Sequence, residues 1–255
     1  MIVSISQPAY LPWLGYFDRI ASELHVEPDH VQFEKRSFTS RNKILSANGP
    51  LWLSVPVKTK GLYQQVTIEN LEIDNSTDWR SNHWKNIKQA YSKAPYFKAL
   101  ANEVEGIYSR RWQSLNELCS FSNEIFRRQL GIDRAILRSS KMQARSTKGE
   151  LILDLSKECG ATTYISGPFG REYLSPEIFA EAKVNVLFHD YKHPRYKQLT
   201  QTDRHKSDGE TDNGFKFHPY MSIIDLLFNA GPESLRILRS EESLNSNWQQ
   251  TISVS

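Results

Sequence analysis

The densest group of cationic side chains in the sequence lies between Lys35 and Lys43, and it includes Arg36 and Arg41. No acidic residue falls within this segment, so its charge is not balanced locally as it is on most solvated surfaces. Guanidinium groups bind the oxygens of phosphate and carboxylate in pairs. We therefore expect Lys35, Arg36 and Arg41 to hold a phosphate or a carboxylate, with a solvated loop as the alternative.

Polar and aromatic side chains also follow the first apolar run of the chain. Residues 2–5 are predicted to form a strand, and apolar residues then recur at helical spacing from Trp13 to Leu24. The loop between them contains Gln7, Tyr10 and Trp13, and open α/β sheets bind ligands at the carboxyl ends of their strands. We expect these three side chains to contact a ligand. The alternative is a turn stiffened by proline, with the aromatic rings packed beneath it.

Two later loops follow predicted strands in the same way. The first strand ends in a Ser166-Gly167 turn, where glycine lets a ligand approach the backbone and Ser166 and Tyr173 offer hydroxyl groups. The second strand is followed by His193, whose neighbour Pro194 excludes the helical spacing of a two-histidine metal site. We expect these loops and the opening loop to border one site. A tight turn and an ordinary polar histidine are the alternatives.

A single carboxylate interrupts the last apolar segment of the sequence. Asp225 is surrounded by Ile, Leu and Phe in a helix predicted over residues 223–229, which Ser222 caps. A carboxylate in an apolar helix needs a partner, and we expect a cation of the segment 35–43 or His193 to supply it. The position suits a structural pair or a general base, and both remain open.

The order of elements predicts the fold class, which is α/β with a mainly parallel, Rossmann-like sheet, hairpin additions and a helical insert. Strands and helices alternate in the second half of the chain, an order that gives parallel strands and right-handed crossovers. The predicted elements there are a strand at 135–137, a helix at 149–159, a strand at 162–167, a helix from 175 to 179 and a strand at 184–191.

The first half of the chain adds the hairpins and the insert. Alternating apolar residues predict hairpin strands, and amphipathic spacing predicts helices. The strands are expected at 31–35, 51–57 and 65–73, and the helices at 77–91, 96–109 and 113–130. We expect residues 1–76 and 131–240 to form the two halves of the α/β domain, 77–130 a helical subdomain, 201–214 a loop and 241–255 a polar tail.

Composition excludes several classes of function. The net charge of +3 is too small to indicate nucleic acid or an anionic membrane as a partner. Cys119 and Cys159 are too few for a disulfide framework or a zinc site, which fits a reducing cytoplasm. We find no signal sequence and no apolar run long enough to span a membrane, so we expect a cytoplasmic protein without an integral membrane segment.

Most motifs of catalysis and nucleotide binding are absent, including GxGxxG, GxxxxGK[ST], GxSxG and HExxH. The opening segment has the strand, proline-containing loop, glycine and helix of HxGH nucleotidyltransferases. Pro12 and Gly15 are present, but both histidines of that motif are missing. Nucleotidyl or adenylyl transfer is therefore one alternative function.

Several blocks of the sequence, in one order, resemble the WbqC-like protein family. The blocks include ISQPAYLPWLGYFDRI at 5–20, VQFEKRSFTSRNKI at 31–44, GATTYISGPFGREYL at 160–174, YKHPRYKQ at 191–198 and HPYMSIIDLLFNAG at 218–231. This chain has Asp29-His30 where the family commonly has two acidic residues. It also has Lys197 where the family often has proline, and both departures bear on specificity.

The resemblance implies a cytoplasmic step in bacterial O-antigen, or lipopolysaccharide, and other surface polysaccharide biosynthesis. We expect a transferase that acylates or aminoacylates a nucleotide-linked amino sugar, using an activated acyl donor and no other assigned cofactor. The alternative is a non-catalytic sugar-nucleotide-binding or assembly protein of the same pathway. Pathway enzymes or a second copy of the chain are further partners to consider.

Residues in the matching blocks complete the expected site. We expect a general base among His193, His83 and Asp225. Beyond the contacts named above, we expect substrate contacts from Gln32, Asn42, Tyr196 and Gln198. No metal ligand is assigned.

Overall fold

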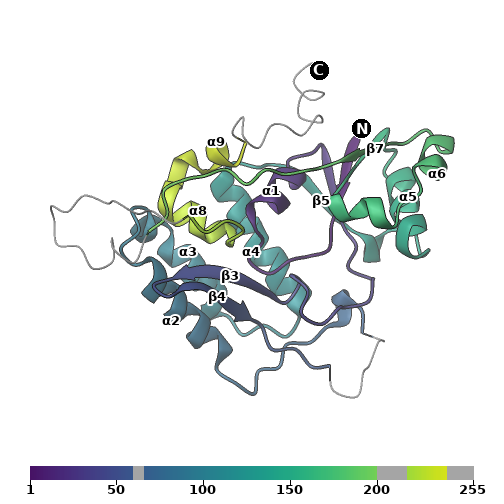
Figure 1. The fold of residues 1–255 in the computed structure, drawn as a ribbon. Coiled ribbons are helices and arrows are strands. Elements are labelled where there is room, and N and C mark those ends of the chain that lie inside the picture. Colours follow the sequence, from purple (N-terminus) through teal and green to yellow (C-terminus); the bar gives the residue numbers. More distant parts are fainter. Residues whose placement is uncertain (60–65, 200–216, 240–255) are drawn as a thin grey trace.

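The computed structural model describes residues 1–59, 66–199 and 217–239, and this part of the chain is built on a five-stranded parallel sheet (Figure 1). The strands lie in the order β5-β2-β1-β6-β7. They are β1 (Ile2–Ile5), β2 (Leu24–Glu27), β5 (Ala135–Arg138), β6 (Thr163–Ser166) and β7 (Asn185–Phe188). The order confirms the predicted Rossmann-like fold. It reverses between β1 and β6, which is the topological switch point where such sheets bind ligands.

The two faces of the sheet differ in polarity because strand side chains alternate between them. One face presents Val3, Val26 and Tyr164 to an apolar cluster that includes residues of α5 (Lys148–Glu158) and α6 (Pro176–Glu181). The other face presents Ser4, His25 and Glu27, all buried, on the side of α1 (Leu14–Ile20). A buried polar layer of this kind must be hydrogen-bonded to be stable.

A larger apolar core joins α1 to the rest of the molecule. It is formed with the antiparallel hairpin of β3 (Arg41–Ser46) and β4 (Gly49–Ser54), and with a set of helices. The helices are α2 (Trp79–Tyr91), α3 (Phe97–Ser109), α4 (Leu115–Leu130), α8 (Ile223–Ala230) and α9 (Ser234–Leu238). The Ser114 side chain accepts a hydrogen bond from the Glu117 amide at the start of α4, and Gly131, with φ 68°, ends it. Figure 1 shows α2 next to the hairpin. It shows α5 and α6 on the side of the sheet away from α8.

The predicted helices of the insert and the α/β elements after residue 131 are confirmed to within a few residues. Short 3-10 turns connect several of them, at Ile68–Asn70, Ser139–Lys141, Pro168–Glu172 and Gly231–Glu233. Residues 201–214 and 241–255 lie outside the described residues. No described helix has the length and apolar character needed to cross a bilayer.

Three predicted elements in the first half of the chain are wrong. Leu24 was expected on the first helix, but it begins β2, because pairing with β1 and β5 on both sides outweighs the helical spacing of a short apolar run. Residues 31–35 form no strand, and Gln32 makes only an isolated bridge to Thr67. The described part of 65–73 contains the 3-10 turn and isolated bridges instead of a strand.

Candidate functional site

The switch point brings the ends of β1 and β6 side by side. β1 pairs with β6 in parallel from Ile2 to Ser4, so the residues that follow these strands leave the same edge of the sheet. Ser6 and Gln7 follow β1 and are half-buried, and Gly167 follows β6. The structure therefore places the predicted contacts Gln7, Ser166 and Gly167 together.

Arg19 of α1 reaches this point from the side. A Cβ atom on Gly167 would lie 2.8 Å from Nη1 of Arg19, so only glycine lets the guanidinium lie this close to the backbone. Ser4 Oγ donates to the Arg19 carbonyl at 2.9 Å and fixes the end of α1 on β1. Helical side chains lean toward the helix N-terminus, and α1 returns antiparallel to β1, so the Arg19 side chain extends toward the carboxyl edge.

One nitrogen of the Arg19 guanidinium has unmet hydrogen-bonding capacity in the described part of the chain, although the residue as a whole is only half-buried. Its Nε atom is buried and has no hydrogen-bond partner among the described residues. Burial lowers the pKa of Arg19 below its usual value. Because a buried N–H group without a partner is costly, an anion at this position would relieve the cost and receive paired hydrogen bonds. Arg19 is thus the best candidate on the described chain for an anion ligand at the switch point.

A hydrogen-bonded chain under Arg19 orients Ser6. His25 Nδ1 lies 2.7 Å from Ser4 Oγ, and His25 Nε2 lies 3.2 Å from Ser6 Oγ. The Ser4 hydroxyl donates its proton to the Arg19 carbonyl, so it can only accept from His25. The tautomer that satisfies both contacts therefore has Nδ1–H donating to Ser4 and Nε2 accepting from Ser6. Burial, followed by the Arg19 charge, lowers the pKa of His25 to about 3, so the ring stays neutral at physiological pH.

A buried carboxylate and histidine join the third strand end to α1. Asp18 Oδ2 and His189 Nε2 are 2.7 Å apart, and both side chains are at most 2% exposed. The His189 amide donates to the Ser166 carbonyl at 2.8 Å. The pair fixes the residues after β7 against the helix that carries Arg19, which makes Asp18 and His189 positioning residues for the switch point.

Tyr173 lies between the switch point and a surface groove. Its hydroxyl interacts with that of Tyr164, and its ring is half exposed. Burial raises the pKa of Tyr173, and the nearby Arg19 charge opposes this rise. The groove has a volume of about 290 Å³ and is bordered by the starts of α5 and α6. The structure thus places the predicted contact Tyr173 beside Arg19.

Tyr10 and His83 lie elsewhere, in the apolar core. The Tyr10 hydroxyl is 2.8 Å from His83 Nδ1 and 2.7 Å from the Tyr108 hydroxyl. Tyr10 is fully buried and His83 is 6% exposed. Burial lowers the pKa of His83 to about 4. This arrangement matches the alternative of aromatic rings packed beneath the opening loop.

Asp225 is the centre of a second buried network. Its carboxylate accepts hydrogen bonds from Tyr91 Oη at 2.8 Å, Tyr196 Oη at 2.7 Å and Gln198 Nε2 at 2.8 Å. We expected a cation or His193 as its partner, and the structure supplies hydroxyl and amide donors. The network holds the segment after β7 against α8. Figure 1 shows this segment running across the molecule from β7.

We expect Tyr196→Phe to lower the free energy of unfolding by about 2 kcal/mol, because a hydrogen bond to a buried carboxylate is lost. Urea denaturation of both proteins measures the difference. Tyr220→Phe is the matched control, since Tyr220 is 51% exposed and should leave stability unchanged. Equal stability of Tyr196→Phe and the wild type would show that this contact does not anchor the segment.

His193 sits in an aromatic cluster beyond the switch point. Its Nδ1–H donates to the Pro194 carbonyl at 2.9 Å, and its Nε2 is buried without a partner among the described residues. Burial lowers the pKa of His193 to about 4. The cluster consists of Trp13, Tyr191, His193, Tyr196, Phe217 and Tyr220. At about 3.3 Å per extended residue, His193 lies roughly 13 Å along the chain from His189.

The predicted cationic contacts gather on the hairpin. The Arg41 guanidinium lies 4.4 Å from the centre of the Trp52 ring, and its Nε donates to the Arg36 carbonyl at 2.9 Å. Asn42 is buried and donates to the Leu11 carbonyl at 2.7 Å. Gln32, Lys35 and Arg36 are exposed in the turn before β3. The structure thus divides the expected contacts among the switch point, the hairpin, the apolar core and the segment after β7.

The predicted site residues did not include Arg19, Asp18, His25 or His189. Asp18 and Arg19 lie between the apolar positions of a short helix, and His25 lies on a strand that was not predicted. The one available signal was a polar residue within each otherwise apolar segment. It becomes informative only when the sheet order is known.

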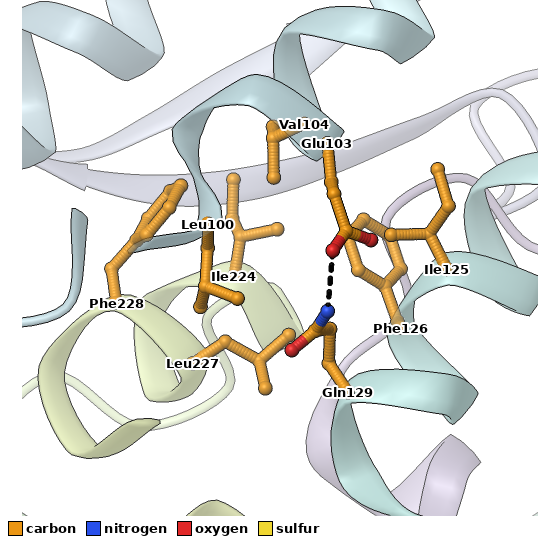
Figure 2. Close-up of a pocket in the computed structure, with 9 residues that line it drawn as sticks. All are labelled: Leu100, Glu103, Val104, Ile125, Phe126, Gln129, Ile224, Leu227 and Phe228. Atoms are coloured by element: carbon orange, nitrogen blue, oxygen red, sulfur yellow. Dashed lines mark hydrogen bonds between the residues drawn. The ribbon is translucent and has the colours of Figure 1, made fainter. Parts of the chain in front are cut away.

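Two other hollows lie away from the switch point. Figure 2 shows a small pocket of about 10 Å³ between α3, α4 and α8, where Gln129 donates a hydrogen bond to Glu103 at 2.8 Å. This is room for about one water molecule. An open hollow at the end of α4 is lined by Glu124, Arg127, Arg128 and Asp133 among others, and it precedes β5, at the amino edge of the sheet. In the described part of the chain, no three His, Cys, Asp or Glu side chains gather as a metal site would require.

Comparison with known proteins identifies the family of this chain. The model of the WbqC-like protein family matches residues 7–237. The uncharacterized protein Rv1507c of Mycobacterium tuberculosis is 35% identical over 248 residues, which cover 93% of this chain and 97% of that protein. No solved structure matches the chain. The chain, with its switch-point arginine and its hairpin cations, belongs to the WbqC-like protein family.

Proposed function

We propose that the protein is a cytoplasmic transferase that acylates or aminoacylates the amine of a nucleotide-linked sugar in surface polysaccharide biosynthesis. The observation that carries this proposal is the Arg19 guanidinium, which lies against Gly167 at the switch point with a buried Nε that has no partner among the described residues. A diphosphate supplies the charge and the oxygens that this group needs. The step in surface polysaccharide biosynthesis that the family resemblance implies supports the choice of substrate.

The residues around Arg19 suggest the division of roles. Ser6 and Gln7 at the end of β1 offer polar groups to the sugar or its phosphates. His193 is the proposed proton acceptor, because its Nδ1–H is committed to the Pro194 carbonyl and Nε2 keeps its lone pair. In transfer from a thioester, the sugar nitrogen bonds to the acyl carbon and the carbon–sulfur bond breaks. The amine proton leaves through His193 to the thiolate.

We expect a product heavier than the substrate by one acyl group when the protein is incubated with UDP- or dTDP-linked amino sugars and acyl thioesters, or with an amino acid and ATP. Mass spectrometry of the nucleotide fraction measures this gain. His193→Asn, which keeps a polar side chain but removes the base, should bind the substrate and form the product at least tenfold more slowly, within the usual contribution of a general base.

A non-catalytic sugar-nucleotide-binding protein is the second candidate. It is favoured by the placement of His83 and Asp225, two of the three expected bases, in buried networks away from the switch point. Binding of the sugar nucleotide without product across the donor panel would select it. Exchange of pyrophosphate into ATP would instead select nucleotidyl or adenylyl transfer.

A further inference from the structure

We propose that the groove between α5 and α6 binds the nucleoside of the nucleotide-linked substrate while Arg19 binds its diphosphate, an assignment that rests on the proposed function. The groove is lined by Thr147, Lys148, Gly149, Glu150, Leu153, Tyr173, Ser175, Ile178 and Phe179. Helices that follow parallel strands begin at the carboxyl edge of the sheet, so this groove opens at the edge where Arg19 lies.

The loop after β6 connects the two places. Gly167, at its start, is the residue against which the Arg19 guanidinium lies. Tyr173, at its end, forms one wall of the groove, and its carbonyl is so close to Gly149 that a Cβ there would approach it to 3.0 Å. One rigid turn of the chain therefore spans the distance from the proposed phosphate position to the groove. A ligand bound along this turn would reach both.

The chemistry of the lining suits a flat heteroaromatic ring. Leu153, Ile178 and Phe179 supply apolar surface, and the half-exposed phenol of Tyr173 supplies a ring for stacking. Backbone N–H groups at the start of α5 lie at the rim, and the N-cap residue Thr147 makes no side-chain bond to them. A nucleobase presents an apolar face and a polar edge, and this groove offers partners for both.

Size and charge argue against other occupants. The volume of about 290 Å³ lies at the lower end of the roughly 300–1,000 Å³ of small-molecule sites, which suits a nucleoside better than a whole sugar nucleotide. Lys148 and Glu150 at the rim have opposite charges, so the groove does not select an anion by itself. In this arrangement Arg19 binds the phosphates, and the residues at the ends of β1 and β7 bind the sugar.

The test is calorimetric binding of UDP, dTDP and inorganic pyrophosphate to the full chain. We expect a nucleoside diphosphate to bind at least tenfold more tightly than pyrophosphate. Tyr173→Ala should remove this difference. Ile178→Trp, which fills the groove from an exposed position away from Arg19, should also remove it and leave pyrophosphate binding unchanged. Phe169→Ala is the control, because Phe169 is 74% exposed on the same turn and does not line the groove.

The outcomes separate this proposal from the proposed function. If Tyr173→Ala and Ile178→Trp keep the wild-type preference for nucleoside diphosphate while Arg19→Met weakens every ligand, the groove is not the nucleoside site and the sugar-nucleotide substrate stands. If the wild type binds UDP and dTDP no better than pyrophosphate, the nucleoside site is overturned. If Arg19→Met changes none of the affinities, the phosphate position on which the proposal rests is overturned too.

Discussion

Replacing Arg19 by methionine is expected to weaken binding of UDP about a hundredfold. The guanidinium would give two charge-assisted hydrogen bonds to a diphosphate, each contributing about 1.5 kcal/mol, and 3 kcal/mol corresponds to roughly two factors of ten in affinity. Methionine retains most of the apolar stem, so the packing of α1 against the sheet is preserved. Isothermal titration with UDP, at one fixed salt concentration, measures the change.

The stability of Arg19→Met distinguishes a binding role of Arg19 from a structural role. Nε of Arg19 has no partner among the described residues, so its removal relieves a buried N–H group whose hydrogen bond is not made. We expect Arg19→Met to unfold at the same or a higher urea concentration than the wild type. Arg19→Lys is the control that keeps the charge but loses the paired donors, and it should bind UDP with intermediate affinity. A destabilised Arg19→Met with unchanged UDP binding would refute the phosphate role.

Acid is expected to destabilise the protein by several kcal/mol between pH 6.5 and pH 4.5. Burial lowers the pKa of His25 to about 3 and those of His83 and His193 to about 4. In this window the unfolded chain binds a proton at each of these histidines and the folded chain does not. The free energy of unfolding is therefore highest above pH 6.5 and decreases as the pH is lowered. Each such histidine contributes about 1.4 kcal/mol per pH unit.

Urea denaturation at pH 7.0, 6.0 and 5.0 measures this dependence. Burial raises the pKa of Glu27, and this opposes the histidines, because the folded state binds that proton more readily. His25→Asn, which keeps a hydrogen-bonding side chain between Ser4 and Ser6, should reduce the slope by about one histidine's share. A free energy of unfolding that is flat from pH 7.0 to 5.0 would contradict the burial of neutral histidines.

The sequence predicted elements well where one periodicity persisted. The helix ending at Leu130 combines an amphipathic pattern with the N-cap Ser114 and the terminal Gly131, and all three are local signals. The strand Leu24–Glu27 was missed because its first residue, Leu24, continues the helical spacing of α1. Its strand character comes from hydrogen bonds to β1 and β5, which are more than a hundred residues apart in the chain.

Site residues, too, were predicted where the signal was local and missed where it depended on distant parts of the chain. The turn of Ser166 and Gly167 and the nearby Tyr173 were identified because glycine after a strand is a local signal, and the structure brings them together with Gln7 at the switch point. The cations between Lys35 and Lys43 were prominent in the sequence, but Arg41 stacks on Trp52 of its own hairpin. Their role as substrate contacts remains a prediction that needs a bound ligand.

The sequence by itself determined the fold class, the insert helices, the glycine turn after β6 and the family. Only the tertiary structure decided which polar residues face the switch point. Arg19 is one more basic residue on a short helix until the sheet order places Gly167 beside it. Burial and unmet hydrogen-bonding capacity depend on neighbours from distant parts of the chain, which no local pattern reports. The same physics assigns the buried Tyr10 and Asp225 to the packing of the core.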